Sequence, residues 1–157
     1  MLKKIKSSSL RPSGGRFAIV ASTYNGQYVA GMLSAASKCL RAAKAETIKV
    51  VRVPGAFEIP VAAVRLARAH SPPLDAIICL GVILRGATTH AQNIAEAVSG
   101  ALTQLQLQYE IPIIHEVLLL ESKEQAAVRC LSKDHNRGAE AAQTALEMAR
   151  VMRELDK

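Results

Sequence analysis

The stretch AIICLGVIL at residues 76–84, followed directly by RGATTH at residues 85–90, decides the fold class of this chain. An almost unbroken apolar run of this length is typical of a strand that is buried on both faces in the centre of a parallel sheet. Three further apolar or β-branched runs predict the other strands of the sheet, at residues 16–21 (RFAIVA), 47–53 (TIKVVRV) and 112–120 (PIIHEVLLL).

Helical patterns fill the segments between and after these strands. Residues 27–44 carry apolar side chains at helical spacing, and an alanine-rich pattern follows at residues 57–70. Strand and helix therefore alternate, which predicts a parallel sheet with helices on both faces. The remaining helices are expected at about residues 89–109, 122–131 and 138–153.

The length of 157 residues, without an internal repeat or a linker, indicates a single domain. We predict an α/β domain over residues 16–157, a flavodoxin-like three-layer α/β/α sandwich around a four-stranded parallel sheet. The polar residues 1–15, which include Lys3, Lys4 and Lys6, are expected to form a flexible basic arm.

The composition excludes several classes of protein. Hydrophobic residues make up 50% of the chain and charged residues 21%, as in globular rather than disordered proteins. The longest apolar runs fall short of the roughly 20 residues of a membrane-spanning helix, and no secretory signal begins the sequence. We therefore expect a cytoplasmic protein without a membrane partner. Cys39, Cys79 and Cys130 have no close spacing, which predicts reduced thiols rather than a metal site.

The net charge of +7 raises the question of an anionic partner. The basic residues are scattered along the chain, aromatic residues make up only 3% of it, and Trp is absent. These features are not typical of a surface that stacks nucleic-acid bases. A small anionic ligand is the better match, and nucleic acid is not expected as a partner.

Three unusual strings follow the first three predicted strands: STYNG at residues 22–26, VPGAFEIP at residues 53–60, and GVILRGATTH at residues 81–90. In open parallel sheets, ligands bind outside the carboxyl ends of the strands, where the winding direction reverses. Each string alone is a weak signal, but their common edge predicts a binding site.

The third string has the residues of an anion site with an acid–base group. A Gly86-Ala87-Thr88 turn that enters a helix leaves backbone N–H groups free for an anion. Thr88 adds a hydroxyl, and His90 can transfer protons near neutral pH. Alternatively, Thr88 or Thr89 is only a helix cap and His90 a surface residue.

The first two strings add groups for a polar ring and its substituents. The Glu58 carboxylate could accept hydrogen bonds from a polyol, or it could only stabilise a helix N-terminus. Tyr24 could stack on a planar ring, or it could be partly buried against the sheet.

Four ordered motifs carry a resemblance to the lumazine synthase (6,7-dimethyl-8-ribityllumazine synthase) family. They are PGAFEIP at residues 54–60, the G-x-I-x-R-G-x-T-T-H string at residues 81–90, EQA at residues 124–126 followed by Arg129, and NRGAEAA at residues 136–142. The resemblance implies a transferase of riboflavin biosynthesis, acting at the penultimate step without a metal or cofactor. It would condense 5-amino-6-(D-ribitylamino)uracil with 3,4-dihydroxy-2-butanone 4-phosphate to 6,7-dimethyl-8-ribityllumazine, releasing phosphate and water.

The resemblance also implies a role for each matching residue. His90 matches the histidine that transfers protons, and the phosphate would be bound by Ala87, Thr88 and Arg129. The pyrimidine and its ribityl chain would be bound by Tyr24, Asn25, Ala56, Phe57, Glu58, Val82, Ile83, Leu84, His115 and Arg137.

Some positions depart from the family pattern. Ala91 and Gln92 replace an aromatic residue and an Asp, and His115-Glu116 replaces an aromatic-Gly pair whose ring covers the neighbouring subunit's site. Arg137 replaces a lysine. These departures keep open a second hypothesis, a relative that binds ligands or forms shells without catalysis. An unrelated flavodoxin-like signalling domain is disfavoured, because the first strand is not followed by an acidic cluster.

The family forms pentamers with each site at a subunit interface, and some members build decamers or sixty-subunit shells. We therefore expect a homo-oligomer built from pentamers, with two small-molecule substrates and riboflavin synthase as a candidate partner. The sequence does not distinguish between the three assembly sizes.

Overall fold

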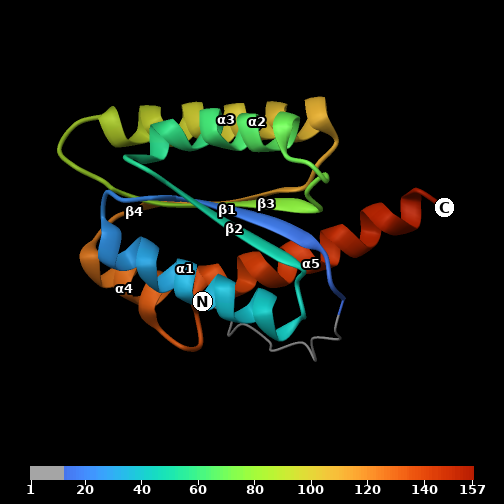
Figure 1. The fold of residues 1–157 in the computed structure, drawn as a ribbon. Coiled ribbons are helices and arrows are strands. Elements are labelled where there is room, and N and C mark those ends of the chain that lie inside the picture. Colours follow the sequence, from blue (N-terminus) through green and yellow to red (C-terminus); the bar gives the residue numbers. More distant parts are fainter. Residues whose placement is uncertain (1–12) are drawn as a thin grey trace.

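The computed structural model describes residues 13–157, which form a four-stranded parallel sheet in the order β2-β1-β3-β4 (Figure 1). The β-branched and apolar runs become strands with nearly the expected bounds: β1 (Arg16–Ser22), β2 (Thr47–Val53), β3 (Ala76–Leu84) and β4 (Ile113–Leu120). The helices are α1 (Gly26–Ala42), α2 (Ile59–Ala69), α3 (His90–Tyr109), α4 (Lys123–Leu131) and α5 (Arg137–Leu155), with a short 3-10 turn η1 (Ala56–Glu58) before α2.

Helices cover both faces of the sheet, so the predicted three-layer α/β/α sandwich is confirmed. Figure 1 shows α2 and α3 above the sheet and α1, α4 and α5 below it. Each face has its own apolar core, and the central strand β3 contributes to both because it is buried from Ala76 to Ile83. No helix of the described part of the chain is long and apolar enough to cross a membrane.

Most of the expected N-terminal arm, residues 1–12, lies outside the described residues. The backbone N–H groups of Ser13 and Gly14 donate to the carbonyl oxygen of Ala43, at 3.0 and 3.3 Å. The carbonyl oxygen of Gly15 accepts from Glu46 N–H at 2.8 Å. Residues 13–15 are therefore fastened to the end of α1 and the start of β2.

The lower layer is held together by Asn136, which is 7% exposed at the N-terminus of α5. Its Oδ1 accepts from the N–H of Gly138 at 2.8 Å, so it caps α5, as asparagine does at many helix starts. Its Nδ2 donates to the carbonyl oxygens of Cys130 at 2.7 Å and Gly31 at 3.3 Å, which belong to α4 and α1. One side chain thus links three helices.

Gly138 allows the backbones of α5 and α1 to approach closely. A Cβ atom at Gly138 would overlap the backbone of Met32 in α1. By contrast, a Cβ atom at Gly100 in α3 would meet no atom within 4 Å. The glycine of the NRGAEAA motif is therefore required by helix packing.

We expect Gly138→Ala to lower the free energy of unfolding by about 1–3 kcal/mol, because overpacking against a backbone outweighs the gain in helix propensity. Gly100→Ala is the matched control and should raise it by up to about 1 kcal/mol, since only propensity changes. Urea-induced unfolding measures both values. Equal effects of the two substitutions would contradict the packing argument.

Candidate functional site

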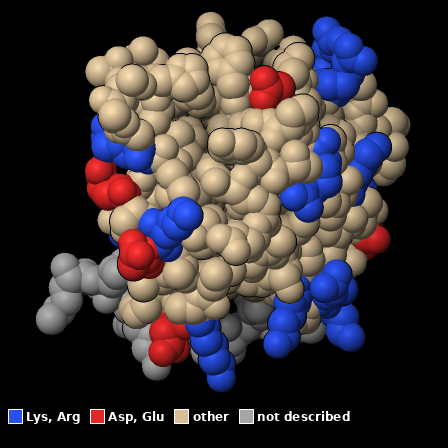
Figure 2. All heavy atoms as spheres, turned by 90° about the vertical axis from the view of Figure 1, so that its left-hand side faces the viewer, with Lys and Arg blue, Asp and Glu red and all other residues tan. Residues whose placement is uncertain are grey.

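A crevice is built into the sheet between β1 and β3. These strands are neighbours, but α1 leaves the end of β1 on one face while α3 leaves the end of β3 on the other (Figure 1). Ligands of open α/β sheets bind at this kind of switch point. Figure 2 views the same edge, with a broad uncharged centre flanked by charged side chains.

A cavity of about 910 Å³ occupies this edge. Its walls come from the loop after β1, from the η1 turn after β2, from the end of β3 and from the first turns of α3. Among its lining residues are nine that the sequence predicted for a site: Tyr24, Asn25, Ala56, Phe57, Glu58, Val82, Ile83, Leu84 and His90.

Asn25 bridges the two diverging strands. Its backbone has a φ of 54°, a left-handed conformation that asparagine tolerates better than most residues. Its Nδ2 donates to the carbonyl oxygen of Val82 at 2.8 Å, joining the end of β1 to the end of β3. Asn25 is therefore a structural element of the cavity as well as part of its wall.

Two aromatic rings stand exposed at the cavity. Tyr24 is 74% exposed and Phe57 is 62% exposed. The backbone of Tyr24 is nevertheless fixed, because its N–H donates to the carbonyl oxygen of Pro54 at 2.9 Å. The alternative that Tyr24 is partly buried against the sheet edge does not account for this exposure, and both rings are free to contact a planar ligand.

Glu58 has a structural role that leaves part of its carboxylate free. Its Oε2 accepts from Gly55 N–H at 2.9 Å and so closes the turn that begins η1. A carboxylate has about four acceptor positions. Glu58 can therefore hold this turn and still accept hydrogen bonds from hydroxyl groups in the cavity.

The turn before α3 presents exposed groups to solvent. Ala87, Thr88 and His90 are all exposed, and His90 is the first residue of α3. Thr89 occupies the N-cap position of α3, as considered above, but its side chain makes no cap hydrogen bond. The Thr88 hydroxyl oxygen accepts a long bond of 3.4 Å from His90 N–H. The N–H groups of this helix start can bind an anion.

Arg85 fixes this turn from the other side. Its Nε donates to Glu121 Oε1 at 2.9 Å, and its Nη2 donates to Gln92 Oε1 at 3.0 Å. Gln92, one of the departures from the family pattern, thus connects α3 to the end of β3. Ala91, another departure, is buried and lines the cavity.

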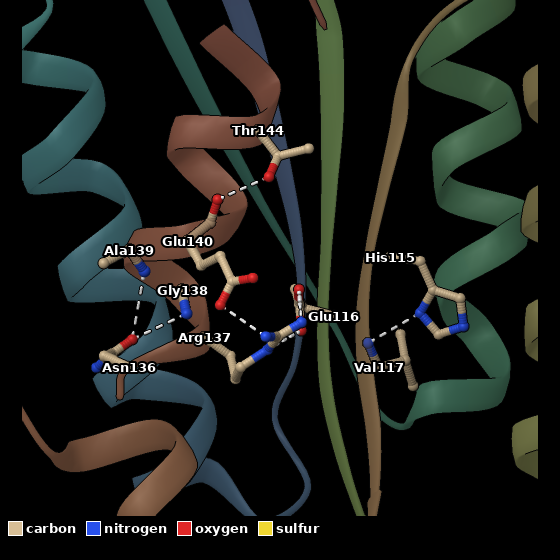
Figure 3. A network of polar contacts seen from close by, with 9 residues as sticks. All are labelled: His115, Glu116, Val117, Asn136, Arg137, Gly138, Ala139, Glu140 and Thr144. Carbon is tan, nitrogen blue, oxygen red and sulfur yellow. Dashed lines mark hydrogen bonds and ion pairs between the residues drawn. The ribbon is translucent and has the colours of Figure 1, made fainter. Parts of the chain in front are cut away.

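Five predicted site residues do not line the cavity. Ala87 and Thr88 lie in the turn just before α3, whereas His115, Arg129 and Arg137 lie on β4, α4 and α5. Arg129 lies half-buried on α4 and makes no hydrogen bond or ion pair with other residues of the range 13–157. Figure 3 shows Arg137 and His115 on opposite sides of β4. One copy of the chain therefore does not bring these three residues to its own cavity.

Arg137 is occupied by two carboxylates that sequence reasoning did not assign to the site. Its Nε and Nη2 donate to both oxygens of Glu116, at 3.0 and 2.8 Å, and its Nη1 donates to Glu140 at 2.6 Å (Figure 3). Burial raises the pKa of the Glu116 carboxyl, and the hydrogen bonds and charge of Arg137 oppose that shift. In the sequence, only the pairing of Arg137 with Glu140 was indicated, by their three-residue spacing on one helix. Nothing in the sequence indicated the pairing with Glu116.

His115 also has partners within the chain. Its Nε2 lies 2.7 Å from Ser99 Oγ in α3, and its Nδ1 accepts from Val117 N–H at 3.1 Å. Burial lowers the pKa of the His115 imidazole. Within residues 13–157, no three His, Cys, Asp or Glu residues are grouped so that they could hold a metal ion.

Fold and site together define an open parallel α/β protein with a ligand cavity at the switch point of its sheet. The family model described as 6,7-dimethyl-8-ribityllumazine synthase matches residues 14–153. The chain therefore belongs to the 6,7-dimethyl-8-ribityllumazine synthase family.

Curated relatives extend over nearly the whole chain. It is 42% identical over 154 residues to the 6,7-dimethyl-8-ribityllumazine synthase of Aquifex aeolicus, covering 97% of this chain and 99% of the relative. It is 37% identical over 155 residues to the enzyme of that name from Clostridium kluyveri, with 98% and 99% covered. A solved de novo designed Rossmann fold protein matches with a TM-score of 0.42 and 13% identity, over 85% of this chain and 97% of the design.

We expect Glu116→Gln to lower the free energy of unfolding by about 1–3 kcal/mol, because Arg137 loses the more buried of its two anionic partners and keeps only Glu140. A fully buried pair would lose about 3–5 kcal/mol, but the Arg137 side chain is 28% exposed. Glu147→Gln, which removes the carboxylate of an exposed pair with Arg150, is the control and should cause no measurable change. Thermal unfolding at pH 7 compares the two. If Glu116→Gln is as harmless as the control, the pair does not stabilise the fold.

Proposed function

We propose that the chain catalyses the condensation of 5-amino-6-(D-ribitylamino)uracil with 3,4-dihydroxy-2-butanone 4-phosphate to 6,7-dimethyl-8-ribityllumazine. The amine and the ketone form an imine with loss of water, phosphate is eliminated, and ring closure releases a second water. The observation that carries this proposal is the cavity, which gathers nine predicted site residues in a chain of this family.

The pyrimidine binds between exposed aromatic and apolar groups. Tyr24 and Phe57 stack on or flank its ring, and residues 82–84 line it from the end of β3. Ala56 offers the η1 backbone, while the free acceptor positions of Glu58 bind ribityl hydroxyls. Asn25 holds the wall against which the ring rests.

The phosphate substrate binds at the start of α3. Ala87 and Thr88 supply N–H and hydroxyl donors, supported by the helix dipole. Arg129 supplies the positive charge, and the fact that no hydrogen bond or ion pair within residues 13–157 engages its guanidinium supports that role. His90, exposed at the same helix start, transfers protons between the two reactants.

Each site is completed by a second copy of the chain. Arg129, His115 and Arg137 lie away from the cavity of their own chain, which supports their contribution to the cavity of a neighbour. Arg137, held by Glu116 and Glu140, retains N–H groups that can reach a ribityl oxygen. We take the assembly to be built from pentamers.

The remaining expectations belong to the same proposal. Residues 16–157 are one domain and residues 1–15 an arm, the enzyme works in the cytoplasm, and riboflavin synthase is a partner because it consumes the product.

The experiment that tests this function mixes the purified full-length chain with both substrates and follows the lumazine absorbance. The rate is compared with that of the spontaneous reaction under the same conditions. Formation above this background, saturable in both substrates, supports the proposal. No excess rate, with lumazine still binding to the protein, would favour a relative that binds the ligand without catalysis.

Replacing Arg129 by Ala should raise the KM for the phosphate substrate about tenfold or more, whereas Arg129→Lys should raise it less. The guanidinium can bind phosphate through two parallel hydrogen bonds, and lysine keeps only the charge. Steady-state kinetics and the oligomer size are measured together. If the Arg129→Ala oligomer is intact and its kinetics are unchanged, the phosphate group binds at another site.

His90→Ala should lower kcat by about 100-fold or less, with both KM values close to those of the wild type. General acid–base catalysis is typically worth about 10²–10⁴-fold, and the low end applies because holding the reactants together supplies much of the rate. His70→Ala, at the far end of α2, is the control. A large rise of KM without a change of kcat would make His90 a binding residue.

A further inference from the structure

His115 is held in one tautomer by an unambiguous donor. The N–H of Val117 donates to Nδ1 at 3.1 Å, so Nδ1 of the neutral ring carries no proton. The proton of the neutral imidazole is then on Nε2, which donates to Ser99 Oγ at 2.7 Å. The two bonds fix both the tautomer and the orientation of the ring.

This tautomer excludes an activated nucleophile. A serine beside a histidine can be a catalytic pair when the imidazole nitrogen facing the hydroxyl accepts its proton. In this chain the nitrogen facing Ser99 is itself the donor, since the other nitrogen is taken by Val117. Ser99 therefore accepts a hydrogen bond from His115 and is not activated as a nucleophile by it.

His115 lies on β4, the edge strand of the sheet. Side chains of the same chain cover part of the outward backbone of this strand. Pro112 and Leu120 accept hydrogen bonds from Ile77 and Arg85 on the β3 side, so the odd-numbered residues of β4 direct their peptide groups outward. The outward N–H of Ile113 donates to Gln106 Oε1 at 2.9 Å, and that of Val117 donates to His115.

Covered in this way, the edge is a poor template for an added strand. Two of the outward N–H groups are covered, so a neighbouring copy at this edge would meet side chains there. The side chain of His115, which is exposed there, is one of the groups that it would meet.

We propose that Ser99 is a positioning residue, which holds His115 as a neutral Nε2–H ring at a fixed angle so that it can cover the pyrimidine of a neighbouring copy's substrate. This proposal rests on the proposed function for its substrate. A neutral, oriented ring stacks on a heterocycle without burying a charge. The bond that Nδ1 accepts from Val117 favours the neutral form, and burial, which lowers the pKa of His115, acts in the same direction. Ser99 is assigned because it is the only partner of Nε2 within residues 13–157.

The kinetic test is a double-mutant cycle on the full-length chain. Ser99→Ala should raise the KM for the pyrimidine substrate by about 2- to 10-fold, the value of one hydrogen bond, with kcat near that of the wild type. In the His115→Phe background the same substitution should change nothing, because phenylalanine needs no orienting bond. An equal effect of Ser99→Ala in both backgrounds would overturn the proposal.

Two matched variants separate positioning from mere structure. Ser99→Thr keeps the hydroxyl and should restore the wild-type KM. Thr103→Ala removes a hydroxyl one turn further along α3, which donates to the carbonyl of Ser99 at 2.9 Å rather than to His115, and should leave the KM unchanged. If Thr103→Ala raises the KM as much as Ser99→Ala, the rise in KM comes from a general disturbance of α3, and Ser99 is not a positioning residue.

Magic-angle-spinning ¹⁵N NMR of the sedimented assembly reads the tautomer directly, and His115→Phe assigns the signals. The wild type should show an unprotonated Nδ1 and a protonated Nε2, and Ser99→Ala should show a mixture of tautomers. A protonated Nδ1 in the wild type would overturn the proposal at its first step. If the wild type instead has the expected tautomer but makes no lumazine, the proposed function fails and the substrate role of Ser99 fails with it.

Discussion

The site depends on one topological constraint, the divergence of the chain at two neighbouring strands. After β1 the chain turns to one face of the sheet, and after β3 it turns to the other, so no helix fills the space above their ends. Such a gap would expose the last peptide groups of both strands. The bond from Asn25 to the carbonyl of Val82 satisfies one of these groups and holds the strand ends together. The apolar wall at residues 82–84 therefore keeps its position without a ligand.

The NRGAEAA motif at residues 136–142 lies away from the cavity but holds the helices of the lower layer together. Asn136 links α1, α4 and α5, and Gly138 lets α5 lie directly on α1. Arg129 stands near the end of α4 and Arg137 at the start of α5, so this link fixes the two helix ends that carry them. Asn136 and Gly138 of the NRGAEAA segment are therefore packing residues, and they fix the position of Arg137, the residue of the segment that we propose to bind the ligand.

The sequence predicted the strands and the cavity wall because both follow from local patterns. The strands β2 and β3 have the same bounds as the runs that predicted them. The strings after the strands lie together because parallel strands end at one edge of the sheet. The pairings of Glu116 with Arg137 and of Ser99 with His115 were not predictable. Their partners lie 21 and 16 residues apart, and which face of β4 each side chain takes depends on the register of the strand. A glutamate and a histidine beside each other in sequence thus reach opposite layers of the sandwich.

The distribution of charge explains how a basic chain can have a mostly uncharged site. Of the three arginines considered for the ligand or its turn, Arg85 is paired with Glu121 and Arg137 with Glu116 and Glu140. Arg129 alone of these three has no such partner within residues 13–157. In the proposed reaction, phosphate recognition would rest on one guanidinium and the N-terminus of α3, which belong to different layers of the chain. Since those layers face away from each other across the sheet, a single copy cannot easily direct both at one phosphate group, whereas two copies in contact can. The placement of these charges thus supports the proposal of a site shared between two copies of the chain.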